Sequence, residues 1–188
     1  MILAQQAMDE TAFLSLARPF VQVAQEAGVA VILDGDTRVA GRLGVDGIQF
    51  GQDIDTLRDA IDRFTPKMMI GAANVRTRHN ALVLGELEPD YLMFGKPGGD
   101  THAEPHPKNL ALGEWWASMV EIPGIVMGGT DIQGVIPIAQ SGADFAALSS
   151  AIFAPDSSGN SGADAAQKVA ETNKLLDEHA PQFEIDEL

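Results

Sequence analysis

The feature that most constrains the fold is a junction that occurs three times along the chain. In each copy a helix-like stretch leads through a short turn to an Asp, and four or five apolar residues follow at once. A helix that ends in a turn and continues directly into a buried strand is typical of a repeated α/β unit, and uninterrupted apolar strands suit a parallel sheet covered on both faces. The copies occupy residues 43–50, 88–94 and 141–148. They predict an α/β barrel or a doubly wound sheet.

Hydrophobic periodicity and turn residues predict about seven strands that alternate with helices. Asp9 and Asp53 are expected to cap the helices that follow them. The expected strands are 1–6, 29–33, 47–50, 68–71, 91–94, 124–127 and 145–148, and the expected helices are 10–28, 37–43, 53–61, 81–87, 115–120, 132–140 and 163–179. An eight-stranded barrel needs one more strand and typically about 250 residues. We therefore expect a (β/α)8 TIM barrel that lacks its first βα unit in this chain.

The length and composition favour one domain. The chain has 188 residues, of which 45% are apolar, which suffices for one sizeable core. We expect a single barrel domain over residues 1–180, a flexible connector at 157–162 and an acidic tail at 181–188. The absence of Cys excludes disulfides and thiolate metal sites. No apolar run is long enough for a membrane span, and the start lacks an export signal, so a soluble cytoplasmic protein is expected.

The net charge limits the partners. Twenty-seven acidic residues against 12 Lys and Arg give a formal charge of −15, which disfavours nucleic acid because a phosphate backbone requires clustered cations. An anionic small molecule would have to be held by local backbone N–H groups rather than by the overall field. Most of the acids are expected to lie on solvated helix faces.

Candidate functional residues follow the ends of the expected strands, where barrel enzymes carry their sites. Gly128-Gly129 lets the backbone come close to a ligand, and Ser149-Ser150 opens a short helix one strand later. Adjacent N–H groups at the ends of the last two strands of a barrel commonly hold a phosphate group. The alternative is that the glycines only form a tight turn and the serines only cap a helix.

Several of these segments resemble the family of thiamine phosphate synthase and its sister, the thiazole tautomerase. The resemblance covers roughly residues 1–154, and it is carried by 32–34, 44–52, 70–72, 90–95, 122–129 and, most specifically, 142–153. It implies an eight-stranded α/β barrel and a reaction that joins an aminopyrimidine methyl pyrophosphate to a thiazole phosphate with Mg²⁺. It also implies that Gly128, Gly129, Ser149 and Ser150 hold the thiazole phosphate.

The pyrophosphate half of the family's site is altered in this chain. Where the family has an Arg and a Lys, this chain has Ala4 and Gln6, and Asp34-Gly35-Asp36 stands where the family has Asn-Asp-Arg. The family's metal-binding Asp falls on Ile54, between two acids. The residues that could provide an oxygen-rich Mg²⁺ site are Asp34, Asp36, Asp53 and Asp55. Asp53 and Asp55 are equally well explained as a helix cap and a first-turn acid.

Three further features of the sequence each have a purely structural alternative. Lys96 stands where the tautomerase branch has a His, so it is the candidate catalytic base, with an ordinary surface lysine as the alternative. His102 and His106 are four residues apart, but the intervening and following prolines break a helix, so a mobile loop is expected rather than a zinc site. Trp115-Trp116 is expected to serve packing or an oligomer contact.

Two functions remain open. The first is the synthase reaction or a close relative of it, and the second is a degenerate relative, or a tautomerase-like enzyme, that binds a phosphorylated small molecule or a partner. We expect the chain to assemble with copies of itself. The segment Gly95 to Lys108 is expected to be mobile without ligand.

Overall fold

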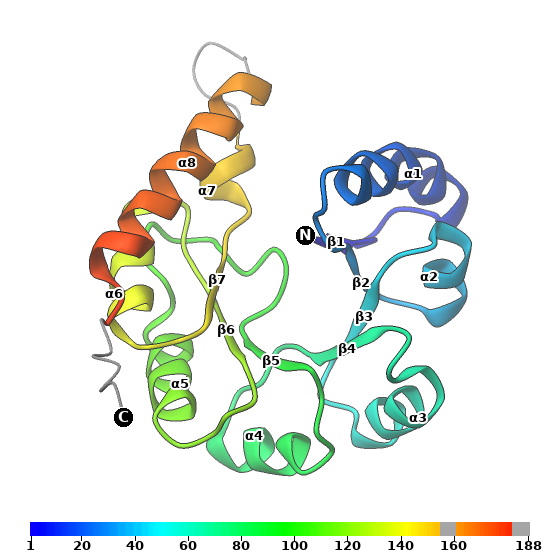
Figure 1. The fold of residues 1–188 in the computed structure, drawn as a ribbon, viewed down its shortest axis with the longest axis horizontal. Coiled ribbons are helices and arrows are strands. Elements are labelled where there is room, and N and C mark those ends of the chain that lie inside the picture. The colour runs from blue at the N-terminus through cyan, green and yellow to red at the C-terminus, as the bar shows by residue number, and fades with distance from the viewer. Residues whose placement is uncertain (155–160, 182–188) are drawn as a thin grey trace, which may run out of the picture. The chain divides into compact units, whose positions relative to one another are not determined.

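The fold is described from a computed structural model, which describes residues 1–154 and 161–181. The predicted connector lies mainly, and the predicted acidic tail almost wholly, outside these residues. Seven strands form one sheet whose order follows the chain, β1 to β7 (Figure 1). The chain divides into two compact units, residues 1–92 and 93–188, which are described in turn. The predicted alternation of seven strands with helices is confirmed.

The first unit alternates four parallel strands with four helices and ends in β5. Its elements are β1 Ile2–Ala4, α1 Glu10–Glu26, β2 Ile32–Asp34, α2 Thr37–Leu43, β3 Gly47–Phe50, α3 Ile54–Phe64, β4 Met69–Ala72, α4 Arg78–Gly85 and β5 Tyr91–Phe94. In Figure 1 the helices α1, α2 and α3 lie on one side of the strands. Between them is a core of apolar side chains from α1, β2, α2 and β3, among them Phe13, Val21, Leu33, Val39 and Ile48.

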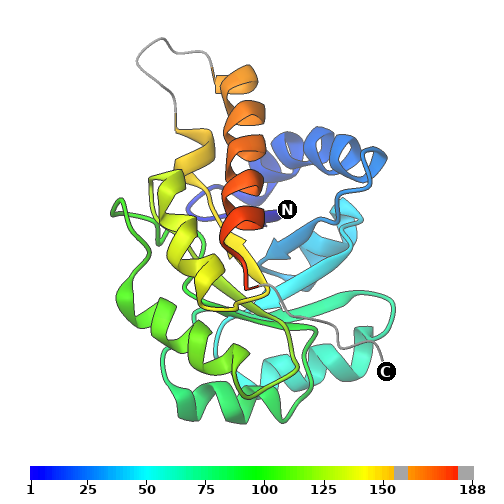
Figure 2. The same cartoon turned by 60° about the vertical axis from the view of Figure 1, so that its left-hand side comes forward.

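The second unit continues the pattern. Its elements are α5 Pro107–Ala117, β6 Gly124–Met127, a 3₁₀ turn η1 Ile132–Gly134, α6 Val135–Gln140, β7 Phe145–Ala147, α7 Ser150–Phe153 and α8 Ser161–His179. Helix α8 packs along α6 and α7 (Figure 2). Trp116 is fully buried, its ring meets Phe94 edge-on at 6.2 Å between centroids, and its Nε1 donates to the Ile122 carbonyl at 2.7 Å. The prediction that Trp116 serves packing is therefore confirmed.

The junction that repeats in the sequence has one geometry in all three copies. Two residues before each Asp the backbone is left-handed, with φ of 68° at Gly44, 54° at Glu88 and 77° at Gly142. The Asp side chain then accepts the backbone N–H of a residue at the beginning of the preceding strand or, for Asp46, just before it. These bonds join Asp46 to Val31 at 2.8 Å, Asp90 to Ile70 at 2.6 Å and Asp144 to Gly124 at 2.7 Å. The Asp therefore ties the start of β3, β5 and β7 to the start of β2, β4 and β6, respectively.

Some element boundaries differ from the prediction for identifiable reasons. Val29 was expected to start a strand, but its N–H bonds to Ala24 and closes helix α1, so β2 begins at Ile32. Helix α5 was expected at 115–120 but begins at Pro107. Pro breaks a helix from within, but at the first helical position its missing N–H costs nothing. The segment expected to be a loop up to Lys108 therefore ends at His106, which caps the helix.

Candidate functional site

The four predicted phosphate-binding residues lie in two adjacent loops of the second unit. Gly128-Gly129 follows β6 and is buried, while Ser149 is exposed and Ser150 is the first residue of α7. The Gly128 N–H donates to the Ala147 carbonyl at 2.8 Å, which holds the ends of β6 and β7 together. The structure thus brings the two predicted segments side by side. We call Gly128, Gly129, Ser149 and Ser150 the cradle.

The chain after β5 lies against this cradle. The Thr130 N–H donates to the His102 carbonyl at 2.8 Å, and the Asp131 N–H donates to the Ala103 carbonyl at 3.2 Å. A Cβ atom at Gly129 would stand 2.1 Å from the Ala103 carbonyl oxygen. Only glycine fits at residue 129, because any side chain would push the backbone of Ala103 away.

Asp100 is the residue of this region that the sequence did not reveal. It is only 6% exposed, and its carboxylate accepts the Ser150 N–H at 2.5 Å. The two residues are 50 positions apart, so no local pattern marks the contact. The nearest signal in the sequence is an acidic residue directly after Gly98-Gly99, in the loop that follows β5. An N–H group that was predicted to hold a ligand's phosphate is thus bonded to the protein's own carboxylate.

The other candidate residues after β5 are Lys96, His102 and His106, which are all exposed. Lys96 is exposed, and its carbonyl accepts the Gly99 N–H at 2.9 Å in a turn. His106 caps α5, its Nδ1 accepting the Lys108 N–H at 3.2 Å, while His102 is exposed outside any helix. The two histidines do not share a helix face, as predicted.

The predicted carboxylates of the first unit have different roles. Asp36 caps α2, accepting the Arg38 N–H at 2.7 Å, and Asp53 caps α3, accepting the Thr56 N–H at 2.7 Å. The backbone hydrogen bond from Arg38 lowers the pKa of the Asp36 carboxyl, and hydrogen bonds from the side chain and then the backbone of Thr56 lower that of Asp53. Asp55 is an exposed first-turn acid. The cap and first-turn interpretations of Asp53 and Asp55 are therefore confirmed.

Asp34 differs from these three. It was expected just after a strand but is the last residue of β2, where it pairs with Gln49 of β3 in the sheet register. Burial raises its pKa above the usual value, and the Gln49 side chain partly offsets the rise. Within residues 1–154 and 161–181, no three His, Asp or Glu side chains come together as a group that could hold a metal ion. Asp36 and Asp53 serve as helix caps, and a Mg²⁺ site on the four candidate carboxylates stays a prediction.

A buried polar pair beside Asp34 was also missed by the sequence analysis. Gln49 is fully buried, and its Oε1 accepts the Tyr91 hydroxyl at 3.0 Å. On its other side, the Gln49 side chain is the hydrogen-bonding group that partly offsets the rise in the Asp34 pKa. Desolvation raises the pKa of the Tyr91 hydroxyl, which therefore stays protonated as a donor. The ring of Tyr91 occupies the space above Gly71, where a Cβ would approach it to 2.1 Å.

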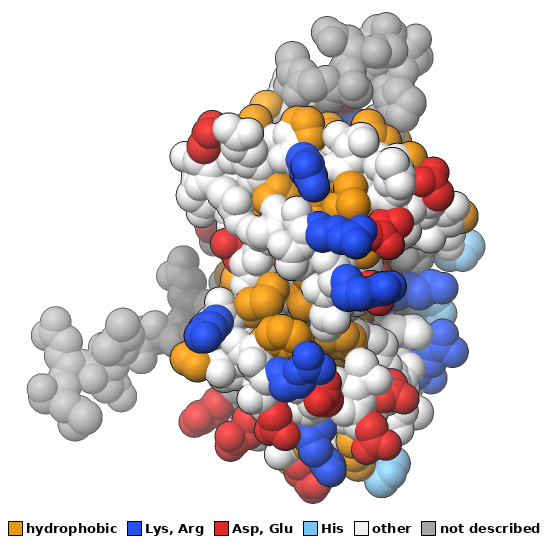
Figure 3. All heavy atoms as spheres, turned by 90° about the vertical axis from the view of Figure 1, so that its right-hand side faces the viewer, with side chains coloured by type: hydrophobic (Ala, Val, Ile, Leu, Met, Phe, Trp, Pro, Cys, Tyr) orange, Lys and Arg blue, Asp and Glu red, His pale blue; other side chains and the backbone are white. Residues whose placement is uncertain are grey.

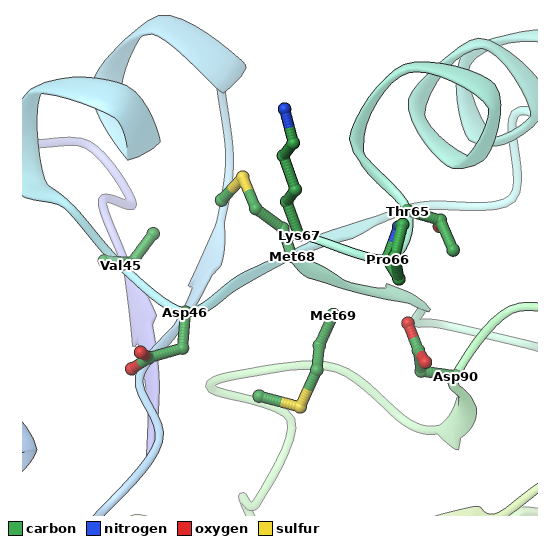
Figure 4. A pocket seen from close by; sticks show the side chains of 8 residues that line it. All are labelled: Val45, Asp46, Thr65, Pro66, Lys67, Met68, Met69 and Asp90. Atoms are coloured by element: carbon green, nitrogen blue, oxygen red, sulfur yellow. The ribbon is translucent and has the colours of Figure 1, made fainter.

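A pocket of about 310 Å³ lies at the N-terminal ends of β3, β4 and β5 (Figure 4). It is lined by Val45, Asp46, Thr65, Pro66, Lys67, Met68, Met69 and Asp90. Asp46 and Asp90 already serve the junctions, and the pocket contains none of the predicted site residues. In Figure 4 the Lys67 side chain extends away from both carboxylates.

Comparison with known proteins agrees with the resemblance seen in the sequence. The family model described as thiamine monophosphate synthase matches residues 1–152. The thiamine-phosphate synthase of Erythrobacter litoralis is 31% identical over 156 residues, covering 79% of this chain and 71% of that protein. That of Hyphomonas neptunium is 35% identical over 132 residues, covering 70% of this chain and 60% of that protein. The chain thus spans about 60–71% of the length of these two relatives.

A solved structure supports the fold independently. The thiamine phosphate pyrophosphorylase from Pyrococcus furiosus superposes with a TM-score of 0.76 at 20% identity, covering 96% of this chain and 83% of that one. At this identity the likeness establishes the α/β barrel-like fold alone. Because the family model matches most of the chain and the two sequence relatives carry the same family name, this chain belongs to the thiamine monophosphate synthase family.

Proposed function

We propose that this protein acts in thiamine biosynthesis as a thiamine phosphate synthase-like transferase, joining an aminopyrimidine methyl pyrophosphate to a thiazole phosphate. The observation that carries the proposal is the family match over residues 1–152 together with the meeting of the cradle segments at the ends of β6 and β7. In this reaction the bond from the pyrimidine methylene carbon to the pyrophosphate oxygen breaks, and the thiazole nitrogen forms a bond to the resulting carbon cation.

The cradle supports the thiazole phosphate half of the proposal. Gly129 has no side chain, so a ligand can reach its backbone once the backbone of residues 102–103 has moved away from it. Backbone N–H groups suit a phosphorylated ligand in a protein of charge −15, because they attract an anion locally. We expect no nucleic-acid partner. Within the described part of the chain no helix has the length and apolar content of a membrane span, and we propose that the protein works in the cytoplasm.

Fewer residues of this chain support the pyrophosphate-binding half of the proposed site. Charge development at a leaving pyrophosphate is normally met by cations. Lys96 is the candidate on the second unit, as an exposed cation after β5 or, in a tautomerase-like reaction, as a base. Because Mg²⁺ commonly binds through one or two carboxylates together with substrate phosphates, we propose that it binds with the pyrophosphate and that Asp34 supplies a ligand oxygen.

A degenerate relative that binds a phosphorylated small molecule without making thiamine phosphate is the second candidate. It is favoured by the neutral Ala4 and Gln6, where the resemblance led us to expect cations, and by the helix-capping roles of Asp36 and Asp53. Titration with the pyrimidine pyrophosphate and Mg²⁺ separates the two candidates. A synthase binds it, whereas a degenerate phosphate binder takes up the thiazole phosphate alone.

Further parts of the proposal concern assembly. We propose that residues 1–180 form a single α/β barrel domain around the seven-stranded sheet. On α1 the side chains of Leu16, Phe20 and Val23 are 54%, 61% and 65% exposed and are spaced for one helix face. Figure 3 shows hydrophobic side chains exposed among Lys and Arg on one face of the molecule. This apolar stripe supports a homo-oligomer, which Phe20→Glu should weaken in analytical ultracentrifugation, whereas a monomeric wild type would refute it.

A further inference from the structure

The loop after β5 reaches the cradle at three points. We call residues 96–105 the covering loop. Its Asp100 carboxylate accepts the Ser150 N–H, its His102 carbonyl accepts the Thr130 N–H, and its Ala103 carbonyl accepts the Asp131 N–H. All three N–H groups belong to the segments that follow β6 and β7. The covering loop therefore accepts hydrogen bonds from Ser150 in the cradle and from the two residues that follow Gly129.

Asp100 differs from the two carbonyls because it brings a charge. A carboxylate oxygen and a phosphate oxygen accept an N–H in the same way, and both are anionic acceptors of strong hydrogen bonds. With 6% exposure, Asp100 is shielded from water, so a second anion at the Ser150 N–H would meet it with little screening. The two groups therefore exclude each other at this donor.

The packing around Gly129 also excludes a phosphate group, here through backbone carbonyl oxygens of the covering loop. The position of a Cβ on Gly129 lies 2.1 Å from the Ala103 oxygen and 2.6 Å from the His102 oxygen. The free space over Gly129 is thus taken by carbonyl oxygens, which also repel an anion. A phosphate group can approach the Gly129 backbone only after these residues move away.

We propose that Asp100 is a specificity-determining residue of the cradle, which competes with the ligand's phosphate for the Ser150 N–H. The inference rests on the proposed function, since it assumes that the cradle takes a thiazole phosphate. Asp100 lowers the affinity for the phosphate ester at least tenfold relative to a cradle without it. It leaves the affinity for the corresponding thiazole alcohol unchanged, because an uncharged hydroxyl does not need this donor.

Calorimetric titration of two ligands against four proteins tests the proposal. The ligands are the thiazole phosphate and the thiazole alcohol, and the proteins are the wild type, Asp100→Ala, Asp100→Asn and Glu104→Gln. Glu104 is an exposed residue of the same loop, so Glu104→Gln is the matched control for the loss of one negative charge. The Asn variant keeps an oxygen that can accept the N–H, so it tests the charge with the loop contact intact.

The expected result is a dissociation constant for the phosphate ester at least tenfold lower in Asp100→Ala and about three- to tenfold lower in Asp100→Asn. The alcohol and the Glu104→Gln control should each stay within twofold of the wild-type values. If the wild type binds the ester and neither Asp100 variant binds it more tightly, phosphate binding by the cradle is supported but the role of Asp100 is refuted. If none of the four folded proteins binds the ester, the proposal that the cradle binds thiazole phosphate is refuted, and so is the role of Asp100.

Discussion

Removing the junction aspartates should destabilise the fold in a graded way. Each carboxylate accepts a backbone N–H of the preceding strand, and such charge-assisted bonds contribute about 1.5–3 kcal/mol when they are well protected. Asp90 and Asp144 are exposed, whereas Asp46 is half-buried and also accepts the Gln25 side chain at 3.1 Å. We therefore expect Asp46→Ala to lower the free energy of unfolding by about 2–3 kcal/mol, and Asp90→Ala and Asp144→Ala by about 1–2 kcal/mol each.

Urea denaturation followed by circular dichroism measures these differences, with an unchanged slope showing that the unfolding reaction is the same. The Asn variants keep one acceptor oxygen and should lose less than half as much as the Ala variants. Asp62→Ala, an exposed acid within α3, is the control and should change stability by less than about 0.5 kcal/mol. If the junction variants lose no more than this control, or the Asn variants lose as much as the Ala variants, the hydrogen-bond explanation of the repeated junction is wrong.

Three other perturbations follow from the same structure. Tyr91→Phe removes the hydroxyl donor to the buried Gln49 Oε1 and should cost about 1–3 kcal/mol in denaturant unfolding; adding Gln49→Leu should recover part of this, and strict additivity would refute the coupling. Glu88→Gly relieves a left-handed backbone and should stabilise by about 1 kcal/mol, whereas a loss would show that the Glu88 side chain matters more than its backbone. Because burial raises the Asp34 pKa, its charged form destabilises the fold above that pKa, so Asp34→Asn should raise Tm at pH 7 and the gain should shrink as the pH falls toward 3.8; a gain that does not depend on pH would contradict this.

The regular parts of the fold were predictable because their signals are local. The turn before Asp46 and the apolar run after it determine β3 to the residue, and the same holds for β5. Asp9 and Asp53 cap their helices as expected, since a cap depends on only the next three residues. Helix α5 was placed eight residues too late, because one Pro can either end a helix or begin it.

The candidate site was predictable only in its glycines and serines. Strand ends bring Gly128-Gly129 and Ser149-Ser150 together through the topology of the sheet, which the alternation of elements already indicates. The contact of Asp100 with Ser150 and that of Tyr91 with Gln49 join residues 50 and 42 positions apart. Such contacts depend on where loops and side chains settle in three dimensions, and no spacing rule reports them.

The most direct test of the account is whether the full chain makes thiamine phosphate. The protein is mixed with thiazole phosphate, the aminopyrimidine methyl pyrophosphate and Mg²⁺, and the product is followed by fluorescence after oxidation to the thiochrome. The account predicts formation of thiamine phosphate that depends on both substrates and is abolished by Gly129→Asp, which fills the cradle. Binding of the thiazole phosphate without any product would contradict the synthase proposal and leave a phosphate-binding relative in its place.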